Sequence, residues 1–111
     1  MGRNKEETEK KEGIIFSVEF HPEVEFDLLQ AHEFYEEQRA GLGDEFILCA
    51  EASLNYISRQ PRHFPKIFSH TRHCLIKRFP YGVFYIIIKN TVYVTAIVHL
   101  SRNPKVWNKR I

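Results

Sequence analysis

The stretch "FYEEQRAGLGDEF", residues 34–46, joins two helical patterns through a short loop that contains two glycines. Gly41 and Gly43 have the conformational freedom that ends one helix and turns the chain toward the next. Two helices joined by so short a connection form an antiparallel αα-hairpin. The stretch therefore predicts a helical hairpin, and the rest of the fold must be arranged around it.

The helices on both sides of this loop are marked by apolar residues at helical spacing. The first helix begins near Pro22, which suits the first helical position, and the second begins near Asp44 and ends at Pro61. The buried stripes comprise Val24, Leu28, Ala31 and Tyr35 in the first helix, and Phe46, Ile47, Ala50, Leu54 and Ile57 in the second.

Segments with the alternation of β-strands lie before and after the hairpin. Residues 14–20 alternate apolar and polar, and residues 66–70, 73–79, 83–89 and 91–100 follow with short turns between them. Short turns imply antiparallel neighbours. The predicted fold class is α+β: an N-terminal strand, the αα-hairpin, then a three- to four-stranded antiparallel sheet with one face under the helices.

The length of 111 residues fits one domain. Residues 1–12 contain Met1 as their single apolar residue and predict a disordered charged tail, so we expect one domain over residues 13–111. No segment reaches the roughly 20 apolar residues that span a bilayer. The chain shows no signal-peptide stretch, and Cys49 and Cys74 fit buried reduced thiols, so we predict a cytoplasmic protein without membrane contact.

Metal and cofactor sites are not predicted. The residues His63, His70, His73 and Cys74 lie close together in the sequence but match no recognised zinc spacing. We expect His73 and Cys74 to point to opposite faces of one strand. A glycine-rich phosphate loop and a nucleophile elbow are both missing from the sequence.

Charge is distributed unevenly along the chain. Residues 1–18 balance, residues 19–60 carry ten acidic and two basic groups, and residues 61–111 carry ten basic groups and no acidic one. Such asymmetry points to an acidic or polyanionic partner for the C-terminal half. The alternative is that the two halves attract each other across the fold.

Several phrases occur in an order that resembles one family, the ParE/RelE superfamily of toxins from type II toxin–antitoxin systems. They are "FYEEQRAGLGDEF", Pro61, Arg72, "FPYGVFY" (79–85), "VTAIVHLSRNP" (94–104) and Trp107. The closest likeness is to the ParE-like group, often called plasmid stabilisation proteins. The resemblance covers roughly residues 16–107 and implies a helical hairpin packed on an antiparallel sheet.

The resemblance implies a toxin but leaves its activity open between two kinds. ParE-like members poison DNA gyrase, whereas RelE-like members are metal-independent nucleases that cut mRNA in the ribosome; both are silenced by an antitoxin segment that wraps the toxin. We favour a ParE-like toxin that inhibits growth by binding its target, because both helices here are acidic and RelE-like toxins place basic groups in that region. The alternatives are a RelE-like endoribonuclease and a non-toxic nucleic-acid or protein-binding module. Homodimerisation stays open.

Candidate site residues lie in the basic half. If the chain is a nuclease, His99 could act as base or acid, while Arg72, Arg78 and Arg102 could hold the phosphate. The candidates for binding a target or phosphate are Arg72, Arg78, Arg102, Lys105, Trp107, Lys109 and Arg110.

Each of these candidates also has a structural interpretation. Strand alternation groups His99 with Tyr93, Thr95 and Ile97 on the exposed sheet face, and Val94, Ala96 and Val98 on the helix-facing side. His99 could instead serve only as a hydrogen-bonding residue at a strand end. Trp107 could fold back on the core, and Arg102 could pair with Glu36 or Glu37 of the first helix.

Overall fold

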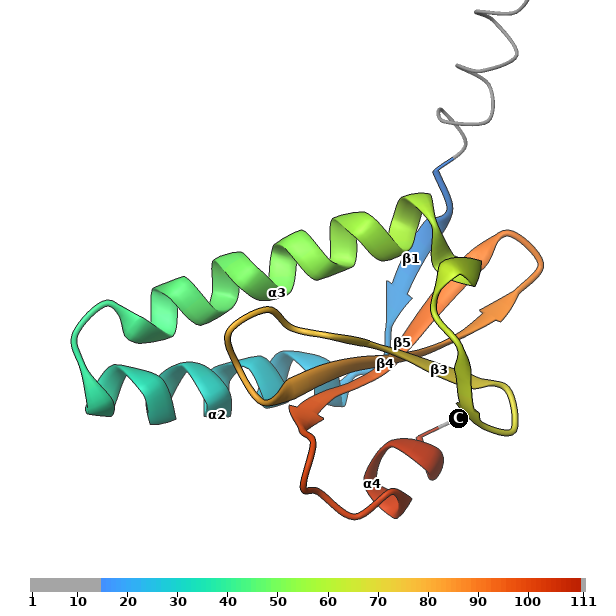
Figure 1. Ribbon diagram of the computed structural model, residues 1–111. Helices are drawn as coiled ribbons and strands as arrows, with labels where there is room; N and C mark the ends of the chain where they lie inside the picture. Colours follow the sequence, from blue (N-terminus) through green and yellow to red (C-terminus); the bar gives the residue numbers. More distant parts are fainter. Residues whose placement is uncertain (1–14, 111) are drawn as a thin grey trace, which may run out of the picture.

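The computed structural model describes residues 15–110, so the predicted disordered tail lies outside the described residues. Its elements are β1 (Ser17–Phe20), α2 (Glu23–Gln38), α3 (Leu42–Arg59), the 3-10 turn η1 (Pro61–His63), β2 (Lys66–Phe68), β3 (Thr71–Leu75), β4 (Tyr81–Ile88), β5 (Thr91–His99) and α4 (Lys105–Asn108) (Figure 1). Among the described residues, none of the helices is long and apolar enough to cross a membrane.

The five strands form one sheet in the order β1-β5-β4-β3-β2. Strands β2 to β5 pair with antiparallel neighbours, whereas β1 pairs with β5 in parallel. The predicted α+β class and the antiparallel sheet after the hairpin are confirmed. The parallel edge strand makes the sheet mixed and brings its strand count to five.

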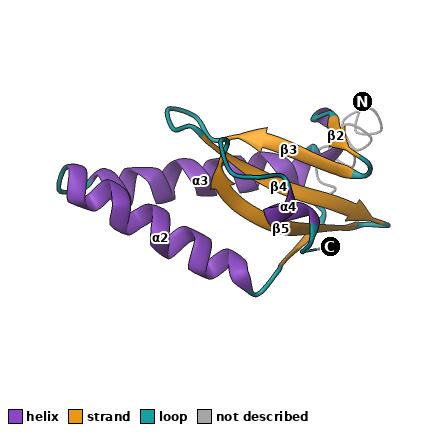
Figure 2. Ribbon diagram, turned by 90° about the horizontal axis from the view of Figure 1, so that it is seen from below, coloured by secondary structure: helices purple, strands orange, loops and turns teal. Residues whose placement is uncertain are grey.

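The helical hairpin covers one face of the sheet, and α4 lies on the other (Figure 2). The main core joins Phe46, Ala50 and Ile57 of α3 to Val83 and Tyr85 of β4. A smaller cluster lies on the opposite face, under α4. The sheet is therefore the middle layer, and the short C-terminal helix forms part of the third.

A β-bulge divides β5 into two halves of opposite phase. Phe84 pairs with Ala96 but Tyr85 pairs with Val94, so Thr95 is an extra residue, and its hydroxyl donates a hydrogen bond to the Phe84 carbonyl (3.2 Å). An inserted residue moves every later side chain of the strand to the opposite face of the sheet from the one that uniform alternation predicts. The hairpin side is therefore occupied by Val94 before the bulge and by Ile97 after it.

This bulge overturns the predicted alternation in the second half of β5. The prediction was right for Val94 but wrong for Ala96 and Val98, which pack on the α4 side. It was also wrong for His99, which pairs with Tyr81 on the hairpin side. Uniform alternation fails here because the sequence carries no visible mark of the extra residue.

The second half of β5 has no neighbouring strand on its β1 side, because β1 ends at Phe20, opposite Val94. Two side chains supply the missing hydrogen bonds. Asp27 of α2 accepts from the Ile97 N–H (3.1 Å), and Arg110 donates to the Thr95 carbonyl (3.2 Å). The same Arg110 forms a two-pronged ion pair with Asp27 at 2.6 and 3.2 Å.

This ion pair is buried: the Asp27 residue is only 6% exposed. Removing one partner of a buried pair leaves an uncompensated charge, which costs about 3–5 kcal/mol. The pair therefore holds the end of the chain against α2 and β5.

The loop of the helical hairpin is held together by Glu36. Its carboxylate accepts hydrogen bonds from the N–H groups of Gly41 (3.0 Å) and Gly43 (2.7 Å) at the start of α3. Gly41 has a φ of 89°, which favours glycine. Gly43 is needed for space, since a Cβ there would lie 2.5 Å from the His32 carbonyl oxygen.

These hydrogen bonds, led by that from Gly41, hold the pKa of Glu36 below its ordinary value. Because the folded pKa is the lower one, the carboxylate stabilises the fold above the ordinary glutamate pKa of about 4.3, and this stabilisation is lost as the pH falls through the folded value. We predict that Glu36→Gln makes the loss of thermal stability between about pH 5 and pH 3 less steep. A Glu37→Gln control, at an exposed neighbour, should retain the wild-type pH dependence, and equal curves for wild type and Glu36→Gln would contradict the prediction.

Candidate functional site: the basic C-terminal segment

The segment after β5 is anchored to the sheet by Trp107. The indole stacks on Phe84 with ring centroids 4.9 Å apart and planes 12° from parallel, and its edge meets Phe68. With Ala96 and Val98 it forms the core cluster under α4. Trp107 is 6% exposed, so it anchors α4; its predicted part in binding a target or phosphate stays a prediction.

Local hydrogen bonds shape the chain between β5 and α4. The Ser101 N–H donates to Nδ1 of His99 (3.0 Å), and the Lys105 N–H donates to the side-chain oxygen of Asn103 (2.9 Å) at the start of α4. Asparagine is a favoured residue at such a position because its oxygen satisfies a backbone donor. The turn is therefore stabilised by local hydrogen bonds as well as by the packing of Trp107.

Three of the predicted arginines have structural partners. Arg110 is bound to Asp27, as described above. Arg78 pairs with Glu45 of α3 at 2.8 Å and lowers the pKa of that carboxyl. Arg72 donates to the backbone carbonyls of Arg62 and Phe64, next to the turn η1. The alternative that opposite charges attract each other across the fold thus holds for Arg78 and Arg110.

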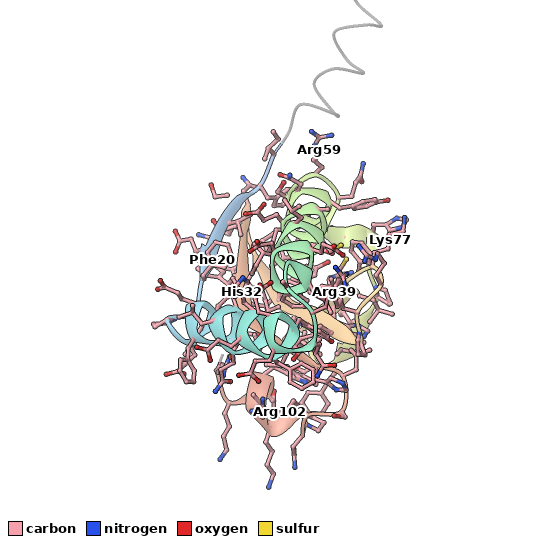
Figure 3. All side chains as sticks on the ribbon, turned by 90° about the vertical axis from the view of Figure 1, so that its left-hand side faces the viewer. Phe20, His32, Arg39, Arg59, Lys77 and Arg102 are labelled. Carbon is pink, nitrogen blue, oxygen red and sulfur yellow. The ribbon has the colours of Figure 1, made fainter. Side chains whose placement is uncertain are left out.

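The other three predicted cations form one exposed group, which we call the C-terminal patch: Arg102, Lys105 and Lys109. Within residues 15–110, no carboxylate lies within salt-bridge distance of them. The expected alternative pairing of Arg102 with Glu36 or Glu37 is therefore not seen. Lys105 and Lys109 are one helical turn apart, joined by a backbone hydrogen bond of 3.1 Å, and Arg102 lies beside α4 (Figure 3).

His99 lies on the hairpin side of β5, with its ring against Tyr81 (5.3 Å between centroids). A hollow of about 130 Å³ is lined by His99 and Arg102 together with Asp27, Phe34 and Tyr81. Burial raises the pKa of Tyr81. Of the proposed nuclease set, the structure thus brings together His99 and Arg102, while Arg72 and Arg78 are bonded elsewhere.

The residue that sequence reasoning missed is Asp27. It lies in phase with the buried stripe of Val24, Leu28 and Ala31, and that position of an acidic residue was the available signal. A buried carboxylate is normally paired, so Asp27 required a cation from elsewhere in the chain. The pattern alone could not have named Arg110 as that partner.

Among the described residues, one group has ligand atoms close enough for a metal ion: His32, Glu36 and Asp44, all within 4.8 Å of one another. Both oxygens of Glu36 already accept hydrogen bonds from the loop, and His32 is bonded to Asp44 at 2.9 Å. The group also lies at the start of α3, where the helix dipole disfavours a cation. The closeness of these three side chains is explained by the hydrogen bonds that join them to each other and to the loop of the hairpin.

Comparisons with known proteins match the chain to solved structures. No family model and no curated protein matches the chain. A solved structure described as "Chromosomal ParDE TA system from P. aeruginosa" superposes with a TM-score of 0.70 at 10% sequence identity, covering 78% of this chain and 98% of that one. At this identity the match shows the fold, and the predicted ParE-like fold is confirmed.

Trp107 is the only tryptophan of the chain, so its fluorescence reports on the docking of α4. We predict that Arg110→Met shifts the emission to longer wavelength under native conditions, because α4 loses its ionic anchor and Asp27 is left unpaired. The same change should lower the free energy of unfolding by about 3 kcal/mol. An Arg102→Met control, at an exposed residue of the patch, should change neither property. Similar shifts in both variants would contradict this account of the anchor.

Proposed function

We propose that this chain is the toxin component of a type II toxin–antitoxin system. It is of the ParE-like kind, acts in the cytoplasm, and inhibits growth by binding an essential target, which the family resemblance suggests is DNA gyrase. The single observation that carries the proposal is the C-terminal patch on a ParE-like fold: three exposed cations on and next to a short helix whose other side is anchored to the sheet. An anchored backbone suits recognition because only the exposed side chains of the three cations then have to be ordered on binding.

Binding is favoured over catalysis by the surroundings of the arginines. Metal-free cleavage of RNA needs a base, an acid and several cations around one phosphate. Arg78 has Glu45 as a partner, and Arg72 has backbone carbonyls. A phosphate near His99 would meet Arg102 alone among the proposed arginines. The ribosome-dependent endoribonuclease remains the second candidate because His99 and Arg102 do share that hollow.

The proposed inhibitor is a cognate antitoxin that supplies an acidic, amphipathic segment. Its carboxylates would neutralise Arg102, Lys105 and Lys109, and its apolar side chains would cover nearby exposed side chains such as Leu100. Complementary charge of this kind sets the speed and specificity of association more than its final strength.

Growth inhibition by charge-reversed variants tests the proposal. The first variant carries Arg102→Glu, Lys105→Glu and Lys109→Glu; the matched control carries Lys66→Glu, Lys77→Glu and Lys89→Glu, three exposed cations elsewhere. Both change the net charge equally. We expect the wild type and the control to arrest growth and the patch variant to lose at least ten-fold in potency. Equal arrest by both variants, at matched levels of folded protein, would contradict the proposal.

The target is identified in strains that express the wild type or His99→Ala. Trapped gyrase–DNA cleavage complexes that persist in His99→Ala would support the ParE-like activity. New codon-linked 5′ ends in translated mRNA that vanish in His99→Ala would support the nuclease instead. A wild-type chain that arrests no growth would leave the third alternative, a binding module without toxicity.

A further inference from the structure

We propose that the turn at the end of α3 binds single-stranded nucleic acid, with one exposed ring that stacks on a base and two arginines that hold neighbouring phosphates. We call this surface the η1 site, and it consists of Tyr56, Arg59, Arg62, His63 and Phe64. Arg59 of the η1 site and Arg102 of the C-terminal patch lie at opposite ends of the molecule (Figure 3). The η1 site is therefore separate from the surface that the proposed toxin function uses.

The aromatic part of the η1 site is a group of three rings in mutual contact. The centroid of the Tyr56 ring lies 5.7 Å from that of His63 and 5.4 Å from that of Phe64, and the last two are 5.2 Å apart. Tyr56 is still 48% exposed. A ring that is held by its neighbours and remains half open to solvent offers a stacking surface for a planar base.

Two exposed arginines supply the positive charge: Arg59 in the last turn of α3 and Arg62 in η1. Within residues 15–110, no carboxylate lies within salt-bridge distance of either side chain. Arg62 lies over the Phe16 ring, 5.3 Å from its centroid, and this cation–π contact positions its guanidinium. Residues 52–66 contain no acidic residue. Because guanidinium groups bind phosphate through two hydrogen bonds, a phosphate backbone complements this surface.

The backbone under these side chains is fixed to the sheet. The Tyr85 hydroxyl donates a hydrogen bond to the carbonyl of Pro61, the buried residue that begins η1 (2.6 Å). Arg72 of β3 donates to the carbonyls of Arg62 and Phe64. Since the turn is already ordered, only its exposed side chains have to be ordered on binding, which lowers the entropic cost.

A hollow of about 590 Å³ adjoins the Tyr56 ring. It is lined by Ala52, Asn55, Tyr56, Arg59 and Gln60. The side-chain amides of Asn55 and Gln60 each carry donors and an acceptor, and the edges of nucleic-acid bases carry both kinds of group as well. A base that stacks on Tyr56 would therefore meet hydrogen-bonding partners beside the ring.

The form of this surface favours a single strand over a duplex or a free nucleotide. Bases within a duplex are stacked on each other, whereas those of a single strand can present their faces to a protein ring. Sites for free small molecules bury most of the ligand, but all five residues that line the hollow are exposed. An acidic peptide would neutralise the two arginines but would leave the Tyr56 ring without a stacking partner.

Binding is tested with the full chain and a labelled single strand of about 12 thymidines, by fluorescence anisotropy. We expect the single strand to bind at least ten-fold more tightly than a duplex of the same length. Two phosphate contacts also predict that its affinity falls about five-fold as salt rises from about 50 to about 150 mM. No binding of the single strand, or equal binding of the duplex or of a polyglutamate peptide, would overturn the proposal.

Variants of the ring test the stacking contact. Tyr56→Leu should weaken binding of the thymidine strand at least five-fold, whereas Tyr56→Phe, which keeps the ring, should bind as the wild type does. The control is Phe26→Leu, at an exposed aromatic residue of α2, and should leave binding unchanged. Wild-type affinity in Tyr56→Leu, or equal weakening in Tyr56→Leu and Phe26→Leu, would contradict the stacking contact and the proposal with it.

Variants of the arginines test the phosphate contacts. Arg59→Gln with Arg62→Gln should weaken binding at least five-fold and reduce its salt dependence. Lys77→Gln with Lys89→Gln removes the same charge from exposed residues elsewhere and should change neither property. Equal effects of the two pairs, with both variants folded by circular dichroism, would show binding by net charge alone and overturn the proposal.

Photocrosslinking locates the bound base directly. A strand that carries 5-iodouracil in place of thymine forms a covalent bond to an aromatic ring stacked on it when it is irradiated. We expect the crosslink within residues 56–64 of the wild type and its loss in Tyr56→Leu. A crosslink confined to another part of the chain, such as the C-terminal patch, would overturn the assignment of the η1 site.

Discussion

The buried ion pair between Asp27 and Arg110 is the contact on which the C-terminal half of the structure depends. The two residues are 83 positions apart in the chain, and they meet where β5 runs on beyond its neighbour β1. There the carboxylate accepts the Ile97 N–H and the guanidinium donates to the Thr95 carbonyl. Two side chains thus form the hydrogen bonds that a neighbouring strand would otherwise form at this edge, so these backbone groups are not left unpaired.

The pair has consequences for the surface as well as for the core. Arg110 lies two residues after the end of α4, so its attachment holds α4 against the sheet, where Trp107 stacks on Phe84. The outward side of the same segment then presents Arg102, Lys105 and Lys109 to solvent. Two cations of the basic half neutralise carboxylates of the helical hairpin, and the three of the C-terminal patch are left for a partner. Some of the unevenly distributed charges therefore stabilise the fold. The proposed function uses the three cations of the C-terminal patch, which have no such partner among the described residues.

Much of the fold could be predicted because regular elements leave a period in the sequence. The apolar stripes and the loop at Gly41 predicted the hairpin, and the four strands after it were found close to their expected positions. The bulge at Thr95 could not be predicted, since one extra residue leaves no compositional mark yet reverses the side on which His99 lies. The parallel pairing of β1 was also missed, because strand order depends on contacts between distant segments. For the same reason, the charge pattern identified the basic half but could not say which of its arginines already had partners.

The central claim is that the Asp27–Arg110 pair completes the open edge of β5, and hydrogen exchange at the Ile97 amide tests it most directly. In the wild type this amide should exchange slowly, as the amides inside β4 do. In Asp27→Ala, and also in Arg110→Met, the exchange rate at Ile97 should increase over that of the wild type. This increase should be much larger than any increase at the amides of β4. The account would be contradicted if the Ile97 amide were unprotected in the wild type. It would also be contradicted if the amide were as well protected in both variants as in the wild type.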